Sequence, residues 1–191
     1  MSENRFELAV WDREQDTILS CRDYLNRRGK DISWSPAASD SAINLSVAGE
    51  EWLGDEWNFG DLQLIVTELE DVFARLQRDE VAILRSAVLS QPQVPYLLFE
   101  PASGDVIKIS MFFLADTDLG AHFPIKYWSN QDPQKLFAHV IENRSTLLSD
   151  SAAGRRPKEL PFPRPELLNA LTDQIELGQE VVKLQDRSHL I

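Results

Sequence analysis

The residues best suited to covalent or metal chemistry are few and widely spaced along this 191-residue chain. The three histidines are His122, His139 and His189, and none of them lies in the spacing of a helical zinc motif. The eight glycines are scattered and form no phosphate-binding loop. We therefore expect no catalytic residue, no metal site and no cofactor.

Two further sets of residues have side chains suited to chemistry. Cys21 could act as a nucleophile, but only Arg22 beside it offers the positive charge that activates a thiolate, so a structural cysteine is favoured. Asp116 and Asp118 have a spacing that can hold Mg²⁺, and the same residues suit a polar turn. Together with His122 they define an alternative hypothesis, a small enzyme or ligand-binding domain with a pocket near these three residues.

The most unusual segment combines tryptophans with carboxylates between residues 50 and 59. In one interpretation the aromatic rings fold under and cover the open end of a sheet. In the other they stand exposed as anchors, surrounded by carboxylates that select lysine and arginine on a partner. The exposure of the tryptophans separates the two interpretations. The candidate partner-binding residues are Glu50, Glu51, Trp52, Asp55, Glu56 and Trp57.

The charge of the chain is negative and concentrated. The formal net charge is -12, and residues 50–80 carry ten acidic residues against two arginines, which accounts for -8 of it. Such a run is either a solvated helix face with an acidic loop or a surface that attracts a basic partner. Nucleic acids and anionic membranes recruit the opposite charge, so we expect neither as a partner. No apolar run approaches a membrane span, and we expect a cytoplasmic protein.

Hydrophobic periodicity predicts the elements that must position these residues. The strongest signal is a helix over residues 62–78, where apolar residues recur at steps of three and four. Residues 16–26 fit a short helix or a strand followed by a turn, with the strand favoured, and residues 49–60 are expected to be turn-rich. Gly104 suits a hairpin loop between the last two of the main predicted strands. The strands are predicted over residues 5–12, 42–48, 81–88, 95–100 and 106–114, with one more over 122–128.

The C-terminal part changes in composition. A second helix is predicted to begin at Pro133, and the proline- and arginine-rich residues 151–165 favour a semi-extended linker. A final helix over residues 166–191 is interrupted by Gly178, at a cost of roughly 1 kcal/mol against alanine. We expect this helix to dock on the domain formed by residues 1–150 rather than meet another chain.

These elements predict an α+β fold with a largely antiparallel β-sheet, helices packed on one face and a C-terminal helix after the linker. The strand at residues 43–47, the turn with Trp52 and Trp57, the helix start at Asp61 and the hairpin at 95–114 resemble the small acidic α+β immunity proteins of bacterial polymorphic-toxin systems. The resemblance covers roughly residues 42–115. It implies a cytoplasmic protein that covers a cognate toxin.

Three functional hypotheses follow from the sequence. The first is an acidic protein-binding module, an immunity or inhibitor protein that neutralises a basic protein partner. The second is the enzyme or ligand-binding domain described above. The third is a subunit that self-associates through the C-terminal helix. The absence of a catalytic motif favours binding over catalysis.

Overall fold

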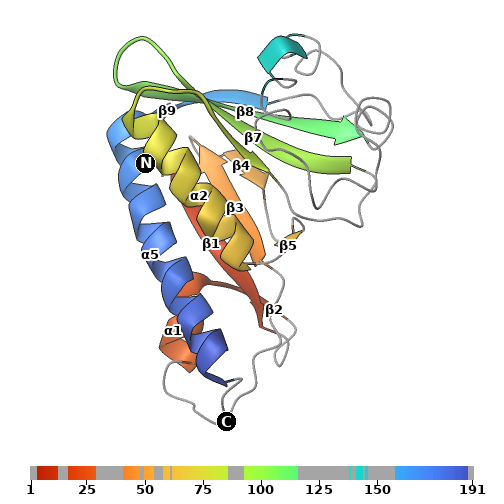
Figure 1. The fold of residues 1–191 in the computed structure, drawn as a ribbon, viewed down its shortest axis with the longest axis vertical. Helices are drawn as coiled ribbons and strands as arrows, with labels where there is room; N and C mark the ends of the chain where they lie inside the picture. The colour runs from red at the N-terminus through yellow and green to blue at the C-terminus, as the bar shows by residue number, and fades with distance from the viewer. Residues whose placement is uncertain are drawn as a thin grey trace.

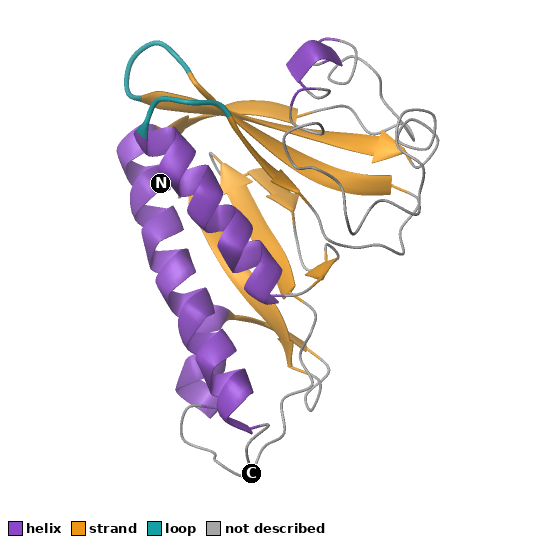
Figure 2. Ribbon diagram, viewed as in Figure 1, coloured by secondary structure: helices purple, strands orange, loops and turns teal. Residues whose placement is uncertain are grey.

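The computed structural model describes residues 4–12, 17–28, 41–47, 50–53, 58–60, 62–85, 93–115, 138, 141–143, 145 and 158–188. They form two antiparallel sheets and a layer of helices (Figure 1, Figure 2). Helices α2 (Leu62–Gln77) and α5 (Arg164–Ser188) lie side by side against the first sheet, and the second sheet lies across one end of this pair. The α+β fold predicted from the sequence is confirmed.

The first sheet has the strand order β2-β1-β3-β4, and β5 also pairs with β3. Strand β1 (Arg5–Asp12) forms where a strand was predicted, and Phe6, Leu8 and Val10 are buried, but Ala9 is buried as well, so apolar and exposed residues do not alternate along its whole length. Within residues 49–60, which were predicted to be turn-rich, two short strands form and pair with β3. The remaining strands are β2 (Thr17–Ser20), β3 (Ser41–Val47), β4 (Glu50–Leu53) and β5 (Asn58–Gly60).

The prediction of a strand and turn over residues 16–26 was half right. The strand β2 ends at Ser20, and helix α1 (Cys21–Arg28) begins immediately after it. The backbone N–H of Asp23 donates to Ser20 Oγ at 3.0 Å, and the Ser20 hydroxyl donates to Asp23 Oδ2 at 2.9 Å. This is a capping arrangement, which satisfies a backbone donor that the first helical turn leaves without a partner. The sequence Ser-x-x-Asp carried that signal.

Helix α2 confirms the strongest sequence prediction. Its apolar stripe is buried against the sheets, and the stripe consists of Leu62, Ile65, Val66, Leu69, Val72 and Leu76. The helix ends in a Schellman motif, in which the Asp79 N–H donates to the Leu76 carbonyl and the Glu80 N–H donates to the Arg75 carbonyl. Asp79 takes the left-handed position of that motif with φ 63°, where glycine is the commonest residue.

The second sheet has the order β6-β7-β8-β9. The predicted hairpin is confirmed, with strands β7 (Gln93–Pro101) and β8 (Val106–Ala115) joined through Gly104 at φ 84°. Strand β6 (Ala82–Arg85) lies within the range predicted for it. The interpretation of residues 151–165 as a linker was wrong for its second half, because β9 (Lys158–Pro163) pairs with β8 and α5 follows without a break.

Helix α5 docks as predicted, against α2, β1 and α1. Gly178 does not interrupt it. A Cβ at this position would lie 2.5 Å from Val66 Cγ2 and 3.0 Å from Leu8 Cδ2, so the glycine allows α5 to approach α2 and β1 closely. Glycine lowers the helix propensity of α5 at this position, and the close packing that it permits against α2 and β1 offsets this cost.

One core joins both sheets and the helices. Phe6 of β1 and Phe99 of β7 meet edge to face with their ring centroids 6.5 Å apart, which links the two sheets directly. The C-terminal elements contribute Phe162, Leu167, Leu171 and Val181 to the same buried cluster. The strand expected at 122–128 and most of the second helix lie outside the described residues, although 138, 141–143 and 145 are helical.

Candidate functional site

The predicted partner-binding segment divides between the described and the undescribed parts of the chain. Glu50, Glu51 and Trp52 lie on β4, while residues 54–57, which include the remaining three candidates, lie outside the described residues. Strand β4 ends the path of the first sheet, and among the described strands it pairs with β3 alone. The structure therefore places two glutamates and a tryptophan on an edge strand.

Trp52 occupies an irregular position within that strand. Ser46 of β3 is opposite Glu51, but the preceding residue, Leu45, is opposite Leu53, so Trp52 is the extra residue of a β-bulge. A bulge bends the strand and increases its local twist, and it occurs preferentially at sheet edges and beside functional sites. The irregularity thus coincides with one of the two candidate anchors.

The acidic residues in the second half of the charged run have partners within the molecule. Asp71 accepts a hydrogen bond from Arg75 Nε at 2.9 Å, and Glu80 accepts one from Arg78 Nε at 3.0 Å. Hydrogen bonding and the charge of Arg78 lower the pKa of Glu80 below its ordinary value. Glu68 is buried. Two acidic residues in this part of the run, Asp71 and Glu80, are thus paired with arginines of this chain.

Arg164 compensates one more of these carboxylates. At the start of α5, its Nη1 lies 2.5 Å from Asp79 Oδ1, and its Nη2 donates to the Leu76 carbonyl at 2.6 Å. A cation at the end of α2 also interacts favourably with the helix dipole. Asp71, Asp79 and Glu80 of the charged run are therefore all paired with arginines of this chain.

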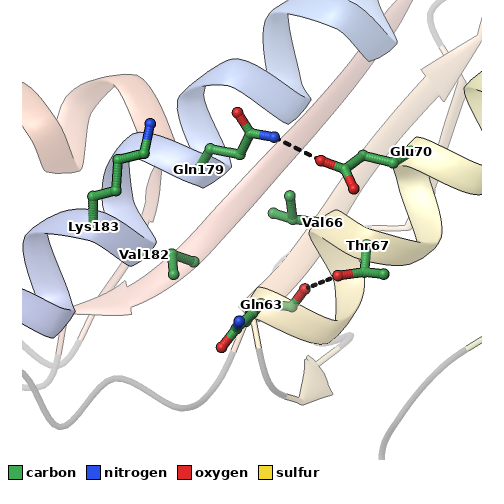
Figure 3. Close-up of a pocket in the computed structure, with 7 residues that line it drawn as sticks. All are labelled: Gln63, Val66, Thr67, Glu70, Gln179, Val182 and Lys183. Atoms are coloured by element: carbon green, nitrogen blue, oxygen red, sulfur yellow. Dashed lines mark hydrogen bonds between the residues drawn. The ribbon is translucent and has the colours of Figure 1, made fainter.

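A shallow groove of about 420 Å³ lies between α2 and α5 (Figure 3). Val66 and Val182 point into it, and Gln179 Nε2 donates to Glu70 Oε1 across it at 2.6 Å. Its other lining residues are Gln63, Thr67 and Lys183. The rim carries both an ammonium and a carboxylate that is already hydrogen-bonded, so it selects neither sign of charge. The groove has weaker grounds for a functional role than the acidic edge.

The residues considered for catalysis are either buried or outside the described residues. Cys21 is fully buried, and burial together with the nearby Glu7 carboxylate raises the pKa of its thiol to about 12. Such a thiol stays protonated at neutral pH, which supports the structural interpretation. Asp116, Asp118 and all three histidines lie outside the described residues. Among those that the structure describes, no group of His, Cys, Asp and Glu is arranged to hold a metal ion.

Three residues that hold α5 against α2 and β1 could not be recognised from the sequence. In the sequence, Arg164 lies in the predicted linker, Gly178 predicts a helix interruption, and Gln174 carries no signal of its role. Gln174 Oε1 accepts a hydrogen bond of 2.8 Å from the backbone N–H of Leu8, one residue beyond the last β1–β2 pair. The side chain of Gln174 thus provides a hydrogen-bond acceptor for a backbone N–H of β1 at a position that β2 no longer reaches.

Comparison of the chain with known protein families, with curated proteins and with solved structures finds no match. No helix in the described ranges has both the length and the apolar character that a bilayer crossing requires.

Proposed function

We propose that this chain is an acidic protein-binding module that neutralises a basic protein partner, as an immunity or inhibitor protein does. The observation that carries the proposal is the position of β4. In the described part of the chain this strand has a neighbour on one side only, and it holds Glu50, Glu51 and Trp52.

Electrostatics supports the same segment. The acidic residues Asp71, Asp79 and Glu80 are paired with arginines of this chain, so they offer less to an outside cation. Residues 50–61 carry five acidic residues and no basic one. Charge complementarity of this kind accelerates association and selects against acidic competitors, and a nearby tryptophan suits the role of an anchor.

A capture experiment with two charge-matched variants tests the proposal. The immobilised protein is exposed to extract of the native cell at low salt, and bound proteins are eluted with a salt step and identified by mass spectrometry. The test variant carries Glu51→Lys, Asp55→Lys and Glu56→Lys. The control carries Asp173→Lys, Glu176→Lys and Glu180→Lys on the exposed side of α5, with the same change in net charge.

We expect the parent and the α5 variant to release the same basic protein, and the first variant to lose it. The association rate of that protein should also fall as ionic strength rises, because screening shortens the range of attraction. Equal capture by both variants would contradict the assignment of this surface.

A further inference from the structure

The two sheets end in strands that differ in what their backbones offer. In β9, Phe162 is opposite Ile107 and the Arg164 N–H donates to the Asp105 carbonyl, so alternate residues 160, 162 and 164 face β8. Pro161 and Pro163 then fall on the outer side, where an N–H would otherwise be exposed. Prolines at such positions protect an edge strand from further pairing.

Strand β4 carries no proline, so its outward N–H groups are retained. Val47 and Glu50 are partners only three positions apart in the sequence, and in such a pair the two residues exchange their backbone hydrogen bonds, so the N–H and C=O of Glu50 are expected to face β3. Because backbone groups alternate along a strand, the N–H and C=O of Glu51 face the outer edge. Within the described residues no strand pairs with that edge.

We infer that the outer edge of β4 accepts an extended basic segment of the partner as an added antiparallel strand. This inference rests on the proposed function and names its mode of binding. Backbone hydrogen bonds of an added strand supply affinity, and the side chains opposite the edge supply specificity. With glutamates at two consecutive positions of β4, lysine or arginine is the complementary residue type on the added strand.

A second copy of this chain does not fit the same edge. Antiparallel pairing of two β4 strands would bring glutamates of both copies together, and like charges on neighbouring strands are destabilising. A basic segment from another protein removes this repulsion and gains attraction instead. The negative charge of β4 thus favours the addition of basic strands and disfavours the addition of acidic ones.

Two peptides of equal charge test the inference by fluorescence anisotropy at low salt. The first alternates lysine and threonine and can form a strand. The second alternates lysine and proline, and lacks half of the backbone donors. The protein is used as the full chain, alongside Glu51→Pro, which removes the outward N–H, and Glu51→Gln, which removes the charge and keeps the N–H. Circular dichroism and thermal unfolding confirm that both variants fold.

We expect the lysine–threonine peptide to bind and the lysine–proline peptide to bind about tenfold more weakly; tenfold corresponds to about 1.4 kcal/mol, which lies within the range for one net hydrogen bond. Glu51→Pro should weaken the first peptide about tenfold, and Glu51→Gln about threefold. Absence of binding, equal binding of the two peptides, or equal losses in the two variants would overturn strand addition. If the capture experiment still separates its two variants in that case, the acidic surface stands and only the mode of binding is wrong.

Discussion

Strands β4 and β9 are both end strands, yet the chain treats them in opposite ways. Strand β9 carries prolines on its outer side and leads directly into α5. Strand β4 carries two glutamates and a bulge at Trp52. Proline removes hydrogen-bond donors and so excludes every added strand, whereas negative charge excludes only some of them. On this comparison, the edge of β9 is protected against the addition of any further strand, whereas the edge of β4 discriminates between added strands by their charge.

The regions around these edges are also held in place differently. The β9–α5 junction is fixed by directed contacts, from Arg164 to the end of α2 and from Gln174 to the backbone of β1. Close packing at Gly178 brings α5 onto Val66 and Leu8. A rigid C-terminal region of this kind can hold the first sheet, and with it the β4 edge, in one geometry.

The largest loss in the free energy of unfolding is expected from Gly178→Ala in α5. Alanine would gain about 1 kcal/mol in helix propensity, but overpacking a dense core costs about 1–3 kcal/mol. The added methyl group would collide with a branched, short side chain that has little room to move. We therefore expect a net loss in the free energy of unfolding, measured in urea.

Two further variants control this prediction. Asn169→Ala, at an exposed position of α5, should leave stability equal or slightly higher. Combining Gly178→Ala with Val66→Ala removes the colliding Cγ2 atom, so the losses of the two single variants should not add. A gain in stability for Gly178→Ala alone would show that the contact between α5, α2 and β1 can accommodate an added methyl group.

A smaller loss is expected from Arg164→Gln. This change removes the ion pair with the exposed Asp79 and the hydrogen bond to the Leu76 carbonyl, and it should cost about 0.5–1 kcal/mol in urea unfolding. Arg22→Gln removes the same charge from an exposed position on α1 and should stay within about 0.5 kcal/mol of the parent. Similar losses in both variants would mean that net charge, and not the contact, matters.

The smallest effect on stability is expected from Pro161→Thr, which sharpens the comparison of the two edges. Threonine restores an outward N–H on β9 without changing the buried side of the strand. We expect stability to change by about 0.5 kcal/mol at most, while aggregation on heating, followed by light scattering, becomes faster. Pro165→Thr at the first turn of α5 should leave the aggregation rate unchanged. If Pro161→Thr also leaves it unchanged, the prolines do not close this edge.

The parts of the fold that were predictable are those in which local pattern and tertiary packing agree. The apolar stripe from Leu62 to Leu76 is long and regular, and Gly104 fits the positive φ of its hairpin. Strand β9 was missed because Pro161 and Pro163 are typical of a linker, and only pairing with β8 reveals that they sit on the outer side.

The candidate site was predictable in residue type but not in position. Glutamates and tryptophans were visible in the sequence, whereas the edge location of β4 depends on the pairing of β3 with the distant β1 on its other side. Pairing that bridges distant segments leaves no local signal. The bond from Gln174 to Leu8 joins residues 166 positions apart, and Gly178 resembled a helix breaker because its neighbours Val66 and Leu8 lie far away in the chain.

The hydrogen bond from Leu8 to Gln174 has a consequence for how the protein is made. During synthesis β1 emerges early, but the side chain that satisfies its backbone and the residues that complete its core belong to α5 and β9. The nascent chain cannot close this core until residues 158–188 have left the ribosome. Chain elongation therefore sets a waiting time, during which Phe6 and Leu8 lack their final neighbours and leave apolar surface uncovered.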